Sequence, residues 1–287
     1  MTSVLPYGSR AGALGRAPRL DRPELSLTNF VAPSQIATSA TSSADLALAA
    51  FPDSYIDPLG NMDVGDCVLA AIEHGRMAKA FTGTVTPEGA PEYLADFRPP
   101  HAGYTLDLYY GCGTSLGYPT PPGRPGPDEG LPIAAALEYL RTRNIIEAYV
   151  QLPLVAPDGT SWTPYQLLNW ATSNFRAVVT GVYLPTRSYD AWQPFGTVWQ
   201  YDGTMAPNPQ LSHALARIGY NGEQVVYWTW GSRVVASENW ESHVTDEAWA
   251  VVTREDVERL GGSYDSLLSA LSTLASAPLS VSAPSRP

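Results

Sequence analysis

Two residues that are far apart in the chain have the types needed for thiol chemistry. Cys67 follows Gly65 and Asp66, a turn residue and an N-cap residue, and begins a helical pattern of small and apolar residues. A thiol in the first turn of a helix faces free backbone N–H groups and the positive end of the helix dipole. We therefore expect a lowered pKa at Cys67 and a better nucleophile. Such a nucleophile needs an imidazole to exchange protons with it.

Among four histidines, His213 is the one that we expect beside the thiol, because it lies in the strand-like run 211–220. His74 follows Cys67 by seven residues. On a helix it would lie about 10 Å along the axis from the thiol, too far to be its base. We expect His74 to be a packed side chain. Two histidines in polar, loop-like stretches receive no role: His101 and His243.

The number of cysteines supports a plainer alternative. Cys67 and Cys112 are the only two, too few for a disulfide framework. One buried thiol and one incidental thiol would explain them equally well. No His or Cys pair has the spacing of a metal site, so we expect no metal and no other cofactor. The acidic pairs Asp128-Glu129 and Asp246-Glu247 are interpreted as solvated loop charges.

The elements that must position these residues change in type along the chain. Small and apolar residues recur at helical spacing over residues 66–81, 131–143 and 163–174. The stretch 82–126 is rich in Gly and Pro and is predicted to form loops. Helices that come first and strands that come later predict an α+β fold. The expected strands are residues 177–184, 211–220, 224–230 and 248–253.

Composition also divides the chain. Residues 1–50 have scattered Pro, Ser and Thr and are expected to form an extended N-terminal arm. Residues 51–260 form the main domain, with a helical part over 51–175 and a strand-rich part over 176–260. Residues 261–287 are expected to form a C-terminal helix and a Pro- and Ser-rich tail.

Charge and hydropathy exclude two classes of partner. The net charge of -11 argues against nucleic acid, since a binder of phosphate backbones needs clustered Lys and Arg. No window approaches the roughly 20 apolar residues of a membrane span, and the first 50 residues lack the apolar run of a signal peptide. We therefore expect no membrane partner and no cleaved secretion signal.

Several segments, in order, resemble papain-like cysteine peptidases. Residues 212–220 (Ser-His-Ala-Leu-Ala-Arg-Ile-Gly-Tyr) are similar to the histidine strand of that family. Residues 228–231 (Trp-Thr-Trp-Gly) are similar to its Asn-Ser-Trp-Gly, and residues 246–251 to its closing strand. The pattern over 128–139 is similar to the segment before its second helix. The resemblance covers about residues 57–253.

A finer pattern narrows the resemblance. Gly60-Asn61, the Gly-Asp-Cys of residues 65–67 and the arm residues 14–18 (Leu-Gly-Arg-Ala-Pro) are similar to uncharacterised papain-like proteins of actinobacteria and their phages. This resemblance implies a papain-like α+β fold in which the nucleophile helix packs against an antiparallel sheet or barrel. It also implies a location in a phage virion or a bacterial cytoplasm.

The resemblance implies roles for individual residues. Cys67 matches the nucleophile and His213 the general base and acid. Asn61, six residues before Cys67, matches the glutamine whose amide donates to the oxyanion. Gly65 and Asp66 lie where the family binds substrate. Trp230, also at the substrate site, matches the indole that shields the imidazole from water.

One position departs from the family. The Asn that orients the imidazole matches Trp228, whose indole N–H offers no acceptor for a ring N–H. Thr229 has an acceptor oxygen, and we expect it to take this role only if the strand register shifts. Neighbouring residues of a strand point to opposite faces, so the two cannot both face His213.

Two functions of different class follow. The first is a cysteine hydrolase that cleaves a peptide or amide bond through an acyl-thioenzyme. The alternative is a papain-fold structural protein of a phage virion, a capsid or tail component that is attached to other virion subunits through its N- and C-terminal arms. Trp228 at the position of the orienting Asn, together with the arm-like ends, motivates the alternative.

Overall fold

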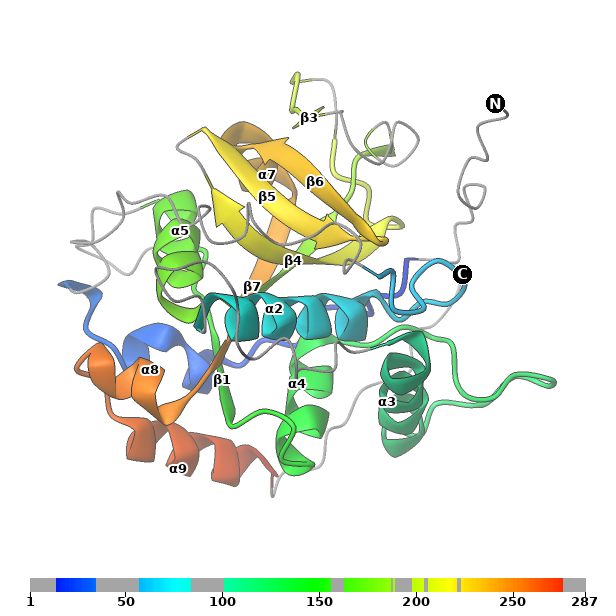
Figure 1. The fold of residues 1–287 in the computed structure, drawn as a ribbon, viewed down its shortest axis with the longest axis horizontal. Helices are drawn as coiled ribbons and strands as arrows, with labels where there is room; N and C mark the ends of the chain where they lie inside the picture. Colours follow the sequence, from blue (N-terminus) through cyan, green and yellow to red (C-terminus); the bar gives the residue numbers. More distant parts are fainter. Residues whose placement is uncertain are drawn as a thin grey trace.

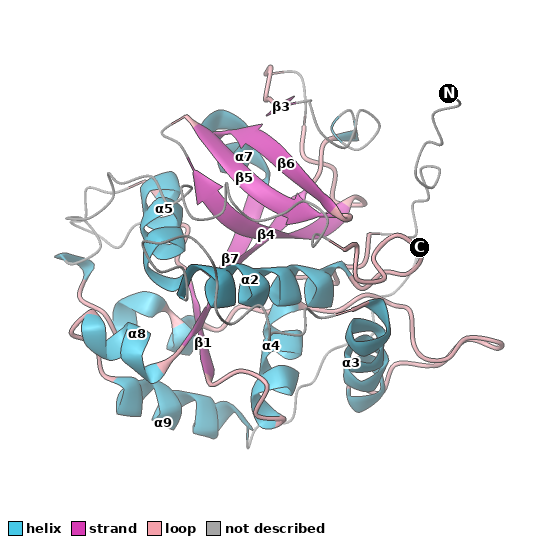
Figure 2. Cartoon of the chain, viewed as in Figure 1, coloured by secondary structure: helices cyan, strands magenta, loops and turns pink. Residues whose placement is uncertain are grey.

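Seven α-helices and a seven-stranded mixed sheet form the part of the chain that is described, which confirms the predicted α+β class (Figures 1 and 2). Two short 3-10 helices precede them, η1 (Pro23–Leu25) and η2 (Leu27–Asn29). The computed structural model describes residues 14–34, 57–83, 101–155, 163–186, 188, 198–203, 206–220 and 223–275.

Three helices match those predicted from apolar periodicity. The helix expected from residue 66 is α2, and those expected from residues 131 and 163 are α4 and α5. Thr163 caps α5 through a capping box with Gln166, as the Thr-Pro start suggested. The helices are α2 (Cys67–Gly83), α3 (Ala102–Ser115), α4 (Ile133–Thr142), α5 (Pro164–Phe175), α7 (Glu238–Val244), α8 (Arg254–Arg259) and α9 (Tyr264–Ala275).

The loop prediction for residues 82–126 is wrong where α3 lies. His101 caps this helix by accepting a hydrogen bond from the Tyr104 N–H. Its glycines serve packing: a Cβ on Gly111 would lie 2.2 Å from the Tyr139 hydroxyl of α4. Cys112 lies between two of these glycines and is a buried helical residue. His243 was likewise expected in a loop and lies in α7.

The sheet has the strand order β1-β7-β2-β4-β5-β6-β3, and all its pairs are antiparallel except β3 with β6. Strands β2, β4, β5 and β7 correspond to the four predicted runs. β1, β3 and β6 were not predicted. The strands are β1 (Ala148–Gln151), β2 (Val178–Tyr183), β3 (Val198–Trp199), β4 (Ser212–Tyr220), β5 (Gln224–Thr229), β6 (Ser232–Ser237) and β7 (Thr245–Val252).

Helix α2 lies at the centre of the molecule, between the sheet and α3 and α4 (Figure 1). It packs mainly against β4 and also against β2 and β5. The backbones approach closely because small residues meet: a Cβ on Gly75 would lie 3.3 Å from the Cα of Ala177. Val68, Leu69 and Ile72 are fully buried, so the helix start is fixed from several sides.

Residues 14–34 of the expected arm pack against this core. Leu25, Leu27 and Val31 are buried in the main hydrophobic cluster. A parallel bridge joins Ser26 to Gln151 at the end of β1. At the other end, α9 buries Leu267 and Leu271 in the same cluster, in the region predicted to be helical. Residues 1–13 and 35–50 of the arm and the tail 276–287 lie outside the described residues.

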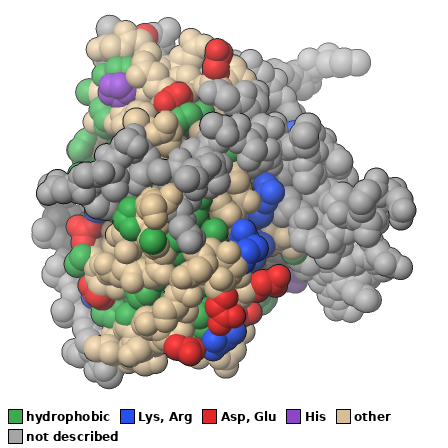
Figure 3. All heavy atoms as spheres, turned by 90° about the vertical axis from the view of Figure 1, so that its left-hand side faces the viewer, with side chains coloured by type: hydrophobic (Ala, Val, Ile, Leu, Met, Phe, Trp, Pro, Cys, Tyr) green, Lys and Arg blue, Asp and Glu red, His purple; other side chains and the backbone are tan. Residues whose placement is uncertain are grey.

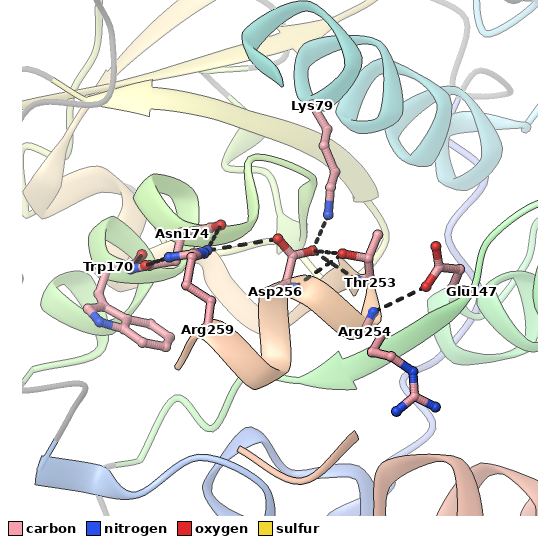
Figure 4. Close-up of polar contacts among 8 residues, drawn as sticks. All are labelled: Lys79, Glu147, Trp170, Asn174, Thr253, Arg254, Asp256 and Arg259. Carbon is pink, nitrogen blue, oxygen red and sulfur yellow. Dashed lines mark hydrogen bonds and ion pairs between the residues drawn. The ribbon is translucent and has the colours of Figure 1, made fainter. Parts of the chain in front are cut away.

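Helix α8 is linked to α2 and α5 by a polar network (Figure 4). Asp256 forms a capping box with Thr253 and an ion pair with Lys79 of α2. Arg259 donates to the side-chain and main-chain oxygens of Asn174 at 3.0 and 2.9 Å. On the side of the molecule that carries α5 and α8, acidic and basic side chains lie next to one another (Figure 3).

Candidate functional site

Cys67 is the first residue of α2, and the turn before it is held in place by the half-buried carboxylate of Asp128. The Asp66 carbonyl accepts the first helical hydrogen bond, from the Ala70 N–H at 3.0 Å. Asp128 accepts hydrogen bonds at 2.9 Å from the Gly65 N–H and from the Tyr109 hydroxyl. This carboxylate was interpreted as a solvated charge, and it anchors the turn before Cys67 instead.

The backbone N–H groups of Gly15 and Ala214 lie beside the Cys67 thiol and act to lower its pKa. Ala214 follows His213 in β4, so the helix start and the histidine strand meet at the sulfur. Only 1% of Cys67 is exposed. Burial raises the pKa of the thiol to about 12, although both N–H groups and the charge of Arg16 act to lower it. The lowered pKa expected from the helix N-terminus is therefore wrong for this conformation.

His213 is fully buried, and its ring is held on two sides. Its Nε2 lies 2.8 Å from the Thr229 hydroxyl. The ring stacks on Trp230 with centroids 4.3 Å apart and planes inclined by 20°. Burial lowers the pKa of His213 to about 3, and the positive charge of Arg16 acts in the same direction. Its Nδ1 has no hydrogen-bond partner among the described residues.

The pairing of β4 with β5 explains why Thr229 rather than Trp228 meets the imidazole. Ala216 pairs with Trp228, so Thr229 lies across from Leu215 and shares its face with His213. Trp228 points to the other face. It contacts the ring of His74 edge-on, with centroids 6.1 Å apart, in the core beside α2. Thr229, which was expected to reach the imidazole only if the strand register shifts, is therefore the residue that faces His213.

Asn61 lies in the turn that leads into α2. Its Nδ2 is 3.5 Å from the Val64 carbonyl oxygen. Burial raises the pKa of Asp66 well above its usual range, and the nearby Asn61 side chain acts to lower it. The amide therefore lies beside the residue that precedes Cys67, held against the turn.

The other sequence candidates are packed. His74 is buried, with Nε2 2.8 Å from the Asp57 carbonyl oxygen, as expected of a core histidine. Cys112 is buried in α3, and burial raises its pKa to about 12. Among the described residues, no group of His, Cys, Asp and Glu could hold a metal ion. No described helix is both long and apolar enough to cross a membrane.

Sequence reasoning missed the ion pairs that lie closest to the site. Arg16 is buried and pairs with Glu247, which is 1% exposed, and with Asp246. The Asp246-Glu247 pair was interpreted as solvated loop charge, and for Glu247 this is wrong. A carboxylate two residues before the buried Trp249 was the available signal, because burial of the strand would carry it inside.

No protein-family model matches this chain, and no curated protein sequence matches it. The geometry of the site therefore carries the functional inference.

Proposed function

We propose that the chain is a papain-like cysteine hydrolase that cleaves a peptide or amide bond, with Cys67 as nucleophile and His213 as base and acid. One observation carries this proposal: the Ala214 N–H lies beside the Cys67 thiol at the start of α2, and His213 is the residue that precedes Ala214 in β4. Thr229, hydrogen-bonded to the far ring nitrogen, supports the same assignment.

The ring nitrogens have separate tasks in this mechanism. When Nε2 carries its proton and donates it to Thr229, Nδ1 keeps a free lone pair. Nδ1 accepts the thiol proton of Cys67, and the thiolate attacks the carbonyl carbon of the substrate. The stacked indole of Trp230 keeps the ring in one orientation and keeps water from it.

The tetrahedral intermediate collapses by breaking the C–N bond. His213 gives its proton to the leaving amine, and the acyl group remains on Cys67 as a thioester. Water, deprotonated by the imidazole, then attacks the thioester, and the acid product leaves as the thiol regains its proton. The Cys67 N–H, free at the helix start, stabilises the oxyanion, and the amide of Asn61 is the second donor.

Catalysis requires that the thiol be uncovered first. In the closed conformation burial raises the pKa of Cys67 to about 12 and lowers that of His213 to about 3. Both groups are then neutral at pH 7. Solvent or substrate at the thiol reduces the desolvation and lets the helix start and the imidazole stabilise a thiolate.

An active-site titration tests the proposal. The intact chain is treated with a peptidyl epoxide, and labelling is located by mass spectrometry. We expect one label, on Cys67, that is lost in Cys67→Ala and after denaturation but kept in Cys112→Ala. If Cys67 reacts no faster than Cys112, or if Cys67→Ala changes nothing measurable, the hydrolase is excluded.

The burial of both reacting groups favours a second candidate, a catalytically inactive papain-fold protein that serves as a capsid or tail component of a phage virion. It predicts an unreactive Cys67 and incorporation into an assembly through the chain ends. Deleting residues 1–13 and 276–287 should then abolish assembly. A truncated chain that assembles normally would count against this candidate.

A further inference from the structure

An extended segment of the chain itself, residues 14–17, lies over the thiol. The Leu131 N–H donates to the Gly15 oxygen at 2.8 Å, and the Ala17 N–H donates to the Leu131 oxygen at 3.0 Å. The Gly15 N–H lies beside the Cys67 thiol. Main-chain hydrogen bonds to an edge are how proteins bind extended peptides, so this segment occupies the position of a bound peptide.

The position of Gly15 accepts no side chain. A Cβ there would lie 1.5 Å from the Gly65 carbonyl oxygen, in the turn before Cys67. On the other side Gly130, with φ +74°, would place a Cβ 2.3 Å from the Gly15 oxygen. Because Gly65 and Gly130 lie on either side of Gly15, there is room beside the thiol for a peptide backbone but not for a side chain.

The side chain of the next residue, Arg16, is buried between two acidic side chains, Asp246 and Glu247, which form the Asp246-Glu247 pocket. Its Nη1 lies 2.6 Å from Glu247 Oε1, and its Nη2 lies 2.8 Å from Asp246 Oδ1. Its Cζ lies 4.8 Å from the centre of the Tyr183 ring. Two carboxylates and an aromatic face are the groups that recognise the planar guanidinium.

The pocket is organised by residues other than Arg16. The Trp249 indole N–H donates to the second carboxylate oxygen of Glu247 at 2.8 Å, which fixes the carboxylate. Gly181 makes the room, since a Cβ there would lie 2.8 Å from Nη1 of Arg16. A buried ion pair stabilises a fold weakly compared with apolar packing, so a mere anchor for the segment would not need this charge.

We propose that the groove lined by Gly65, Leu131 and the Asp246-Glu247 pocket binds extended peptides with the sequence Gly-Arg, and that residues 14–17 occupy it as a tethered competitor. Arginine is the side chain that the pocket selects, and glycine is the residue selected beside the thiol. As a statement about substrate this rests on the proposed hydrolase; as a statement about binding it does not need turnover.

Peptide binding to the full chain tests this directly. The probe is the capped peptide acetyl-Leu-Gly-Arg-Ala-Pro-amide, and its match has citrulline, an uncharged analogue of nearly the same shape, in place of arginine. The receptor is Cys67→Ala with Arg16→Ala, in which no hydrolysis can occur and the pocket lacks its own guanidinium. Calorimetry should find the arginine peptide bound about 30-fold more tightly than the citrulline peptide or better.

Two controls locate the effect. Adding Glu247→Gln to the receptor should remove most of the preference for arginine. Cys67→Ala alone, with Arg16 in place, should bind the arginine peptide more weakly by about tenfold or more, because the tethered segment competes. Equal binding of the two peptides to the folded receptor, or equal binding with and without Arg16, overturns the proposal.

A second measurement decides the matter if Arg16→Ala does not fold. In the Cys67→Ala chain, millimolar arginine peptide should speed hydrogen exchange at the amides of Ala17 and Leu131, and the citrulline peptide should not. No change with either peptide, or the same change with both, overturns the proposal. Because every receptor lacks the thiol, these outcomes are independent of whether Cys67 hydrolyses any bond.

Discussion

At the scale of single residues, the orientation of the His213 ring depends on which side chain hydrogen-bonds to its Nε2. A hydroxyl can both donate and accept through its single oxygen, so Thr229 fits either tautomer of the ring. Thr229 and Trp230 are neighbours in the chain, yet both reach the imidazole, one at its edge and one on its face. The orientation of the base thus comes from the end of one strand, β5, and the turn that follows it.

Thr229→Val tests this orientation. The substitution keeps the shape but leaves Nε2 of His213 buried without its hydroxyl partner, which should destabilise the fold by about 1–3 kcal/mol. Epoxide labelling of Cys67 should slow by roughly tenfold or more, since the base is no longer held. Thr229→Ser keeps the hydroxyl and should behave like the wild type. Equal labelling rates in the Val and Ser variants would contradict the role.

The buried histidines predict how stability depends on pH. The folded-state pKa of His213 is about 3 and that of His74 about 4, both lowered from 6.5 by burial. Below pH 6.5 the unfolded chain binds protons that the folded chain does not, so this stabilisation is complete above pH 6.5 and declines as the pH falls. At pH 5 the loss should be about 2 kcal/mol for each histidine.

Urea unfolding at pH 7 and pH 5 measures this effect. Buried carboxyl groups with a raised pKa, such as Asp66 and Glu247, act in the opposite sense, so the informative quantity is the difference between variants. His74→Leu should lose less stability than the wild type between pH 7 and pH 5, whereas the exposed His243→Leu should follow the wild type. Parallel pH dependence in all three chains would contradict the prediction.

The sequence alone was sufficient to select Cys67 and His213 as candidates, because each lies in a local pattern: a helix start and an aliphatic strand. Thr229 could not be selected over Trp228, since the choice depends on how β4 and β5 pair. Arg16 and Glu247 are separated by 231 positions, and nothing in either neighbourhood indicates the other. Local sequence context was enough to select Cys67 and His213 as candidates. Their charged neighbours come together only through tertiary contacts.

At the scale of elements, a buried ion pair joins β4, the strand that carries His213, to α7. Arg217, four residues after His213 and on the same face of β4, donates to Glu241 of α7 at 2.7 and 3.1 Å. Arg217 also donates to the Leu168 carbonyl oxygen and to Asn169 in α5. One guanidinium therefore joins β4, α5 and α7.

Glu241→Gln should destabilise the fold by about 3–5 kcal/mol, because it leaves the Arg217 charge buried without its counter-charge. The control is Glu238→Gln in the same helix, whose exposed side chain should matter by less than about 0.5 kcal/mol. Urea unfolding of the two variants makes the comparison. Similar midpoints for both would mean that the ion pair does not hold α7 to the sheet.

Elements were predictable where apolar periodicity and caps agreed. α2, α4 and α5 combine apolar periodicity with a capping residue or a proline at their start, and their predicted bounds lie within about two residues of those found. α3 was missed because Gly111 and Gly113 resemble loop residues, although they serve close packing against α4 and Pro127. Strand β6 was missed because its alternation of buried and half-buried residues includes Ser232 and Arg233.

At the scale of the whole molecule, distant parts of the chain converge on one thiol. Gly15 of the segment 14–17 lies beside it, α2 begins with it, and Ala214 of β4, the neighbour of His213, also lies beside it. Residues 14–34 were expected to belong to an extended N-terminal arm. Apolar side chains spaced among prolines, such as Leu25 and Leu27, were the sign that this segment is buried. The closed thiol is thus a property of the complete fold.

The rate at which iodoacetamide alkylates Cys67, measured in the wild type and in His213→Gln with Cys112 as reference in the same chain, tests the central claim most directly. Displacing a four-residue segment costs less than opening the packed α3, so Cys67 should react faster than Cys112 in the wild type. In His213→Gln the Cys67 rate should fall toward that of Cys112, whose own rate stays unchanged. Equal rates for the two thiols in the wild type, or a Cys67 rate that does not depend on His213, would contradict the pairing of nucleophile and base.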